Sequence, residues 1–361
     1  MRLIFFLLEK NKTGGTERVL ATLRQELERE GHEVQLLYLR SALPLEPWER
    51  VIRPAPWRFT EGREILKKKN PFLLFSRLAD ALRLSRDRGR AKRALSRTDP
   101  DGVFLCHPLL LPALPRTLQS RAFLYLHRDP RELFASRAAR GLLLRYKKRL
   151  PLLLLTEEAA SLLRARGFRA EHLPNPLAHL PAERIPAEEN RAVVILSRFS
   201  PEKRLPETVV LLKKAMERHP FPVFLYGEGE EKEAVLAAMG DHPAFTLAPA
   251  PADPKEIWQK ARLTLSLSRH EGYPMALLEA QSYGIPTLTL PFGAGAGTLS
   301  DGGKAGLAAQ NEEDLLSHLL RLLEDDDALR TLSEGAFLHA KAHEKSSVAK
   351  GLVTLLTNEE K

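Results

Sequence analysis

The chain has 361 residues, 43% of them hydrophobic and 28% charged, with a formal net charge of +9. This length exceeds that of one hydrophobic core and the apolar content excludes a disordered chain, so we expect two domains. Because Cys106 is the only cysteine, a disulfide framework and a cysteine-based zinc cage are excluded.

The first half alternates short apolar runs with helical patterns. Residues 3–8 predict a buried strand, residues 17–30 a helix, and residues 34–39 a second, parallel strand. Further strands are predicted at 102–106, 122–126 and 152–156. We therefore expect an α/β domain over residues 1–175. Its opening apolar run is too short for a signal peptide or for the roughly 20 residues of a membrane span.

The second half repeats this organisation after a break. Residues 176–190 are rich in Pro and charge without a regular period, which predicts a linker. A second α/β domain is expected over residues 191–338, and a C-terminal helix within 339–361 that crosses back to the first domain. The alternation is seen in strands at 193–196, 223–226, 263–267 and 286–290 and in helices at 206–217, 231–239, 274–283, 312–324, 328–338 and 346–356.

The two halves differ in charge. Residues 51–150 hold 24 Lys and Arg against 8 Asp and Glu, an excess that favours an anionic partner surface. A solvated basic face that only aids solubility would give the same composition. A nucleic-acid-binding protein is not expected, because few aromatic residues accompany these cations and no nucleic-acid-binding module is visible.

The first chemical motif follows the strand at 193–196. Arg198 and Lys203 lie five residues apart on one loop, at the carboxyl edge where open α/β sheets bind ligands. Two cations at this spacing can hold two phosphates. Taken alone, such a loop is more often simply exposed to solvent.

The second motif, residues 269–280, is the most specific. Gly272 permits a tight turn and Pro274 suits the first position of the following helix. The free N–H groups after Gly272 would then form an anion site, from Tyr273 and from Met275 and Ala276. Glu279, an acidic residue among apolar neighbours, could accept hydrogen bonds from a ribose diol, although a structural ion pair would also explain it.

Two glycine loops complete the set. Gly227 and Glu228 follow the strand at 223–226, where a glycine lets the backbone approach a ligand closely. Gly14 and Gly15 lie between the first strand and the first helix. Their spacing matches neither a P-loop nor the full dinucleotide fingerprint, so only a loop at the sheet edge is predicted.

On these residues the sequence resembles the retaining glycosyltransferase family 4, whose members have the GT-B fold. Glu271 and Glu279, eight positions apart, match the paired glutamates of that family, and Arg198 with Lys203 match its diphosphate-binding pair. Gly14 and Gly15 match its first glycine loop. His127 lies where the family places a histidine near the transferred sugar. One departure is the segment 292–298, which lacks the acidic residue often found there, so no contact is carried over from it.

The resemblance implies two Rossmann-like domains facing each other across a cleft, with the acceptor on the N-terminal side and the nucleotide sugar on the C-terminal side. It implies transfer of a sugar from a UDP- or GDP-sugar to an acceptor hydroxyl, with retention. Glu279 would bind the ribose and Glu271 the donor sugar. A homologue that binds sugar nucleotides without catalysis stays open as an alternative.

No cofactor and no metal are expected, because Arg198, Lys203 and the helix amides can stabilise a leaving diphosphate. The residues at 63–98 and 131–149, which mix Leu and Phe with Lys and Arg, suit the surface of an anionic bilayer. We therefore expect a cytoplasmic protein, attached peripherally to the inner face of the cytoplasmic membrane. The expected acceptor is a lipid-linked glycan of cell-envelope polysaccharide or lipopolysaccharide synthesis.

Overall fold

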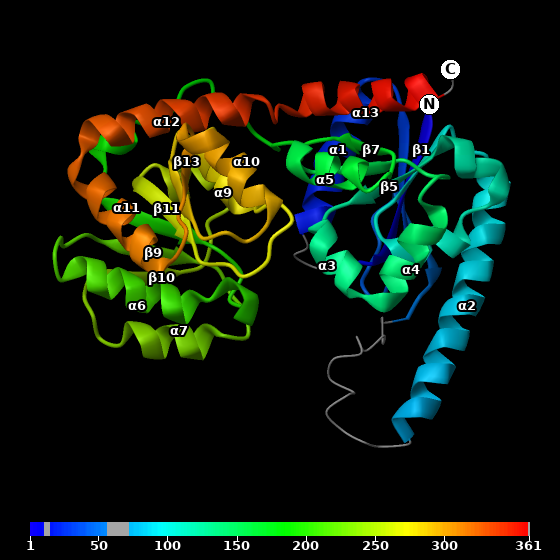
Figure 1. Cartoon of the computed structure of the whole chain (residues 1–361), viewed down its shortest axis with the longest axis horizontal. Coiled ribbons are helices and arrows are strands. Elements are labelled where there is room, and N and C mark those ends of the chain that lie inside the picture. Colours follow the sequence, from blue (N-terminus) through cyan, green and yellow to red (C-terminus); the bar gives the residue numbers. More distant parts are fainter. Residues whose placement is uncertain (11–14, 56–71, 360–361) are drawn as a thin grey trace. The chain divides into compact units, whose positions relative to one another are not determined.

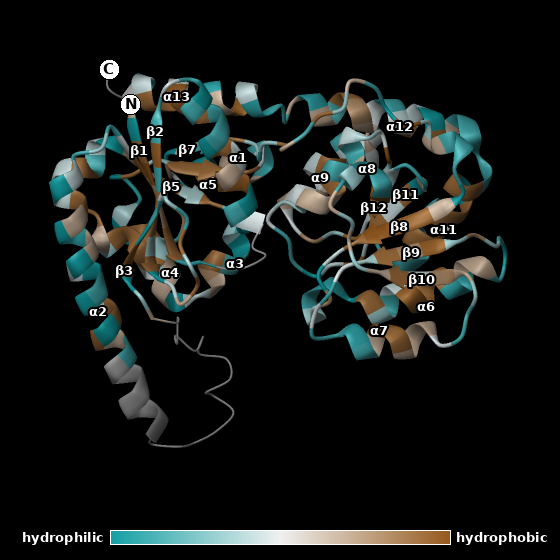
Figure 2. Ribbon diagram, turned by 180° about the vertical axis from the view of Figure 1, so that it is seen from behind, coloured by the Kyte–Doolittle hydropathy of each residue, from teal (hydrophilic) through white to brown (hydrophobic). Residues whose placement is uncertain are grey.

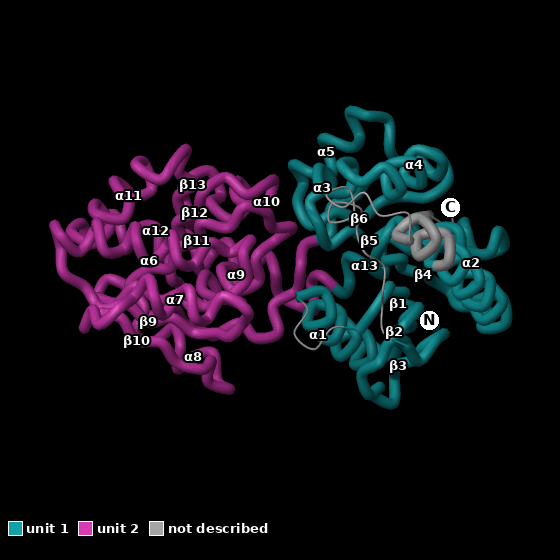
Figure 3. The backbone as a smooth tube through the Cα atoms, turned by 90° about the horizontal axis from the view of Figure 1, so that it is seen from below, with its two compact units in different colours: residues 1–173, 349–361 teal, residues 174–348 magenta. Residues whose placement is uncertain are grey.

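The computed structural model describes residues 1–10, 15–55 and 72–359, and the side chains of all of these except 72–79 and 359. The chain forms two compact units, shown in Figure 3: unit 1 is Met1–Leu173 with Ala349–Lys361, and unit 2 is Pro174–Val348. The predicted linker, 176–190, is thus counted with unit 2. It packs there because the amide of Ile185 donates to the Tyr283 carbonyl at 2.8 Å.

Unit 1 is built on a parallel sheet in the order β3-β2-β1-β4-β5-β6-β7. The central strands are apolar on both faces, and the stacked rings of Phe5, Phe104 and Phe123 join three of them. The strands are β1 (Arg2–Glu9), β2 (Glu33–Arg40), β3 (Glu49–Arg53), β4 (Gly102–Leu105), β5 (Ala122–Leu126), β6 (Leu152–Leu154) and β7 (Ala170–His172). The connecting helices are α1 (Gly15–Arg29), α2 (Phe72–Thr98), the 3-10 helices η1 (Pro108–Ala113) and η2 (Arg116–Arg121), α3 (Pro130–Ala135), α4 (Arg137–Tyr146) and α5 (Glu157–Ala165).

Unit 2 has a six-stranded sheet in the order β10-β9-β8-β11-β12-β13. Its strands are β8 (Ala192–Leu196), β9 (Val223–Tyr226), β10 (Phe245–Ala248), β11 (Ala261–Ser266), β12 (Thr287–Thr289) and β13 (Gly306–Ala308). Its helices are η3 (Ala187–Glu189), η4 (Pro201–Lys203), α6 (Leu205–Met216), α7 (Lys232–Met239), α8 (Pro254–Trp258), α9 (Met275–Ser282), α10 (Ala294–Ser300), η5 (Asp301–Gly303), α11 (Glu312–Glu324) and α12 (Asp326–Lys341). Every strand pairing in the two sheets is parallel, which confirms the predicted α/β class with two Rossmann-like domains (Figure 1).

The last helix, α13 (Lys345–Glu359), begins in unit 2, and its residues from Ala349 belong to unit 1. Leu356 packs against unit 1 so closely that a Cβ placed on Gly102 would come within 2.9 Å of it. This part of α13 therefore belongs to the core of unit 1.

The basic segments predicted at 63–98 and 131–149 contain both buried and exposed leucines. In Figure 2 much of the sheets is brown, and most of the coloured part of α2 is teal. Leu84 in α2 is buried, whereas Leu82 and, in α4, Leu144 are 55% and 53% exposed. Leu66 and the side chains of residues 72–79 lie outside the described residues. Within the described ranges no helix is both long enough and apolar enough to cross a bilayer.

Candidate active site

A lysine–glutamate pair lies at the carboxyl edge of the sheet of unit 2. The neighbouring strands β8 and β11 end at Leu196 and Ser266, and the loops after them are joined by the Arg269 amide, which donates to the Glu202 carbonyl at 2.9 Å. Lys203 Nζ donates to Glu271 Oε1, and both side chains are about 15% exposed. The structure thus brings together two of the predicted site residues that lie 68 positions apart in the chain.

A serine also holds the glutamate of this pair. Ser268 Oγ donates to the same Glu271 oxygen at 3.1 Å and also lies 2.9 Å from Ser266 Oγ. A cavity of about 30 Å³ lies beside Lys203 and Glu271 and reaches Pro274 and Ala276. Because the ammonium has three donors, it can hold Glu271 and still offer a donor to an anion at this edge. Ser268 is a site residue that the sequence motifs did not single out.

The start of α9 differs from the prediction by one residue. Pro274 has an extended backbone, with φ −75° and ψ 104°, so it is the N-cap and Met275 is the first helical residue. The amides of Leu277 and Leu278 donate to the Pro274 carbonyl. Those of Met275 and Ala276 have no acceptor among the described residues, and they are the donors that an anion at this helix end would find.

The loop before α9 is fixed on two sides. A Cβ on Gly295, in α10, would lie 2.8 Å from the carbonyl oxygen of Gly272, so only glycine allows this approach. The side chain of Tyr273 is buried, and its hydroxyl lies 3.1 Å from His343 Nε2. His343 Nδ1 in turn lies 2.7 Å from the carbonyl oxygen of Asn175. Tyr273 therefore offers the site its backbone rather than its ring.

Glu279 has a partner that the sequence did not indicate. The indole Nε1 of Trp258, a fully buried residue at the end of α8, donates to Glu279 Oε1 at 3.0 Å. The half-buried carboxylate is thereby oriented by a rigid neighbour 21 positions away. This contact depends on how the fold places α8 near α9, for which no sequence motif exists.

The other predicted phosphate ligand is not joined to this group. The side chain of Arg198 is 61% exposed and its guanidinium lies 3.5 Å from Glu202. An exposed pair of this kind is worth about 0–1 kcal/mol, so it does not hold Arg198 firmly. Arg198 lies on the same loop as Lys203, but the two cations pair with different carboxylates, Glu202 and Glu271.

The glycine loop after β9 approaches protein backbone. A Cβ on Gly227 would lie 1.8 Å from the carbonyl oxygen of Ser197, and Gly227 has φ +141°. The Phe199 amide donates to the Glu228 carbonyl at 2.9 Å, while the Glu228 side chain pairs with Lys232 at 3.1 Å. These contacts account for the glycine, because they hold the loop that carries Arg198 and Lys203.

In unit 1 the predicted residues lie at the corresponding sheet edge. Gly15 is the first residue of α1, and Gly14 lies outside the described residues. His127 follows β5, its ring 4.1 Å from that of Tyr125, and its Nε2 is buried without a hydrogen-bond partner in the part of the chain described. Burial lowers the pKa of His127 to about 3, so the imidazole is neutral at pH 7.

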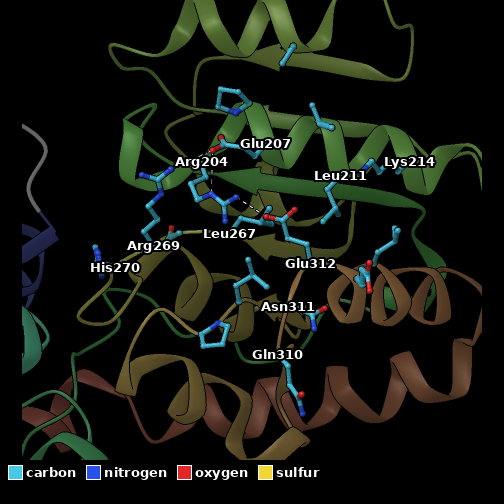
Figure 4. A pocket seen from close by; sticks show the side chains of 18 residues that line it. Arg204, Glu207, Leu211, Lys214, Leu267, Arg269, His270, Gln310, Asn311 and Glu312 are labelled. Atoms are coloured by element: carbon cyan, nitrogen blue, oxygen red, sulfur yellow. Dashed lines mark hydrogen bonds and ion pairs between the residues drawn. The ribbon is translucent and has the colours of Figure 1, made fainter.

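A larger groove, of about 1200 Å³, opens elsewhere on unit 2, between α6 and the start of α11 (Figure 4). Arg204 lies within it, paired with Glu312 at 2.7 Å and with Glu207 at 3.4 Å. Neither Lys203 nor Glu279 lines this groove. The larger groove is therefore not the place where the predicted binding residues lie. We take the sheet edge with Lys203, Glu271 and the α9 amides as the candidate site, because it has the groups that an anionic ligand needs.

Among residues 1–10, 15–55 and 72–359, no group of three or more His, Cys, Asp or Glu is placed to hold a metal ion. The polar groups of the site are a lysine, two glutamates, a serine and backbone amides.

Known proteins share this architecture. The crystal structure of TarM covers 99% of both chains at a TM-score of 0.73 with 12% identity, and a mutant of S. aureus TarM in complex with fondaparinux, alpha-GlcNAc-glycerol and UDP has a TM-score of 0.71, 12% identity and coverage of 99% and 100%. This likeness defines the class of the fold, which is the GT-B fold. Residues 180–339 match the model of the family described as glycosyl transferases group 1.

Curated relatives match over part of their length. An exopolysaccharide phosphotransferase of Streptomyces coelicolor is 26% identical over 266 residues, which cover 71% of this chain and 28% of the relative. A poly(glycerol-phosphate) alpha-glucosyltransferase of Bacillus subtilis is 29% identical over 167 residues, 45% of this chain and 25% of the relative. The chain thus spans about a quarter of the length of these two relatives.

Proposed function

We propose that the chain transfers a sugar from a nucleoside diphosphate sugar, a UDP- or GDP-sugar, to an acceptor hydroxyl with retention of anomeric configuration. The observation that carries this proposal is the pairing of Lys203 with Glu271 beside the unpaired amides of Met275 and Ala276. A cation and helix-terminal amides suit a diphosphate, and a carboxylate suits sugar hydroxyls. The family match over residues 180–339 supports it.

In this proposal Lys203 and the α9 amides stabilise the charge that grows on the diphosphate as it leaves, so no metal or cofactor is required. Glu271, held by Lys203 and Ser268, accepts hydrogen bonds from the transferred sugar. Glu279, oriented by Trp258, accepts from the ribose. Arg198 would join the phosphates after leaving Glu202, at the small cost of an exposed ion pair.

Phosphoryl transfer is a second candidate, favoured by the match to an exopolysaccharide phosphotransferase. The two reactions leave different products from the same donor. Transfer of the sugar releases the nucleoside diphosphate, whereas transfer of a sugar phosphate releases the nucleoside monophosphate.

The test incubates the protein with each of several UDP- and GDP-sugars and a membrane lipid extract. Release of UDP or GDP with a glycosylated product supports the proposal, and release of UMP or GMP favours phosphoryl transfer. Calorimetry that detects nucleotide binding without any turnover would instead indicate the non-catalytic homologue.

We further propose that unit 1 attaches peripherally to the cytoplasmic face of an anionic membrane, where a lipid-linked precursor of a cell-envelope glycan would be the acceptor. The outer face of α4 exposes Arg137, Arg140, Arg145 and Leu144, and these arginines form no ion pair among the described residues. Each Lys or Arg near such a surface contributes about 1 kcal/mol. Co-sedimentation with phosphatidylglycerol vesicles should weaken as salt rises, and absence of binding at low salt would contradict this attachment.

A further inference from the structure

Three basic side chains gather at the carboxyl edge of unit 1, on the helices and loops around η1. Arg88 comes from α2, His107 lies two residues beyond β4, and Arg128 lies two residues beyond β5. The strands β4 and β5 are neighbours in the sheet, and α2 and α4 both pack against η1, which starts directly after His107. We call these three residues the Arg88 cluster.

Arg88 has no hydrogen-bond acceptor or ion-pair partner among the described residues. Its side chain is half-buried, its Nε atom is buried without a hydrogen bond, and its guanidinium forms no ion pair with any described residue. Burial lowers the pKa of Arg88, although the group keeps its charge. The preceding Asp87 cannot serve it, because that fully buried carboxylate is used by Arg40, Arg53 and Arg90. A buried donor without a partner lowers the stability of the folded state by about 1–3 kcal/mol. A bound ligand that supplies an acceptor to Arg88 would remove this cost.

His107 adds a second donor. Its Nδ1 accepts a hydrogen bond from the Leu109 amide at 3.1 Å, so the neutral ring carries its proton on Nε2. Burial, together with the positive charges of Arg128 and Arg88, lowers the pKa of His107 to about 4. Arg128 is exposed, and its one carboxylate partner in the described chain is Glu132, at 3.9 Å.

We propose that the Arg88 cluster binds a phosphate group of the acceptor. It offers a half-buried guanidinium, an imidazole N–H and a second, exposed guanidinium, and the one carboxylate paired with it in the described chain is Glu132, 3.9 Å from the exposed Arg128. The carboxyl edge of a parallel sheet is where such folds place ligands, and arginine meets phosphate oxygens with two parallel hydrogen bonds. This inference rests on the proposed function in naming the ligand as the acceptor; the anion site itself does not depend on it.

The test measures binding of inorganic phosphate to the full chain with UDP added in excess, so that the donor site of unit 2 is occupied. The Hε1 proton signal of His107, identified by its loss in H107Q, is followed by NMR as phosphate replaces chloride at constant ionic strength. Phosphate should shift this signal saturably and raise the pKa of His107, because a bound anion favours the imidazolium. Absence of a saturable shift would overturn the proposal.

Variants distinguish binding at the Arg88 cluster from nonspecific attraction of phosphate by the positively charged surface. R88Q should weaken phosphate binding about 10-fold or more, because it removes a charge-assisted contact. R88K, which keeps the charge but lacks the planar fork, should fall between R88Q and the wild type. The matched control is R93Q, an exposed arginine on the same helix, which should bind phosphate within about 2-fold of wild type. Equal weakening by R93Q and R88Q would overturn the site.

Two probes then distinguish the sources of the phosphate. Saturable binding of glycerol 3-phosphate that is lost in R88Q supports a soluble phosphate ester, and Arg88-dependent binding only to phosphatidic acid vesicles supports a lipid headgroup. Binding of neither probe overturns the assignment to an acceptor. UDP affinity, measured by calorimetry, should be equal in R88Q, R93Q and wild type. Failure of the wild type to bind any nucleotide would contradict the proposed function and leave the anion site standing.

Discussion

Replacing Lys203 by alanine tests the centre of the proposed site. Lys203 is the only cation that contacts Glu271 in the described chain, and the two side chains are 16% and 15% exposed. Loss of one preorganised donor to developing negative charge costs about 10²–10³-fold in turnover, or about 3–4 kcal/mol. K203A should therefore lower turnover by at least 100-fold.

The same change affects stability, because it leaves the Glu271 carboxylate with Ser268 as its remaining partner among the described residues. Breaking a fully buried pair costs about 3–5 kcal/mol, and this pair is partly exposed, so a cost of about 1–3 kcal/mol is expected. The double variant K203A/E271A should then be more stable than the sum of the two single changes predicts, since no charge is left unpaired.

The assay follows release of nucleoside diphosphate from the accepted donor, with chemical denaturation and circular dichroism on the same samples. The control is K214A, which removes an exposed lysine on α6 that lines the larger groove instead of the site. It should leave both turnover and stability near the wild-type values. A folded K203A protein with turnover within 3-fold of wild type would refute the phosphate role of Lys203.

Other changes probe the remaining parts of the molecule. R198A should lower turnover about 100-fold with little change in stability, because the exposed pair with Glu202 contributes at most about 1 kcal/mol; unchanged turnover would remove Arg198 from the site. E279Q should weaken UDP or GDP binding in calorimetry, because the amide replaces a hydrogen-bond acceptor by a donor. W258F, which removes only the indole donor to Glu279, should weaken the same binding less. If both variants bind with wild-type affinity, Glu279 is a purely structural residue. G295A should raise the apparent KM for the donor, since its Cβ would meet the Gly272 carbonyl oxygen at 2.8 Å, and a wild-type KM would show that the loop can shift freely. As pH falls from 6.5 toward 4, the free energy of unfolding should decrease by about 1.4 kcal/mol per pH unit for each histidine buried in its neutral form, because the unfolded chain takes up the proton first. Since the pKa of His127 is lowered to about 3 and that of His107 to about 4, H127Q should flatten this decline, and an unchanged slope would contradict the burial.

Much of the fold follows from local patterns. The strands at 122–126 and 223–226 and the helix at 312–324 have the predicted bounds, because each is a compact apolar run or a strongly amphipathic helix with clear end signals. The edge strand β3 was missed, because Glu49–Arg53 carries three charged residues in five and is held by pairing with β2. Its β structure comes from tertiary pairing rather than from hydropathy.

The site divides in a similar way. Lys203 and Glu271 could be expected together, since each follows a strand of one parallel sheet and such strands end at the same edge. The contacts of Trp258 with Glu279 and of His343 with Tyr273 could not, because they depend on how helices pack, and no spacing encodes that. The position of Pro274 and the exposed orientation of Arg198 are details of backbone and rotamer that a motif leaves open.

The C-terminal helix has a consequence for how the protein is made. On the ribosome the first 173 residues of unit 1 emerge well before Ala349, and all of unit 2 is synthesised in between. At roughly 5–20 residues per second, this interval lasts about 10–35 s. During this interval the sheet of unit 1 is synthesised but Leu352 and Leu356 are not. The apolar surface around Gly102 therefore stays uncovered until α13 is made. Unit 1 begins translation first, yet it can finish folding only after unit 2 is complete.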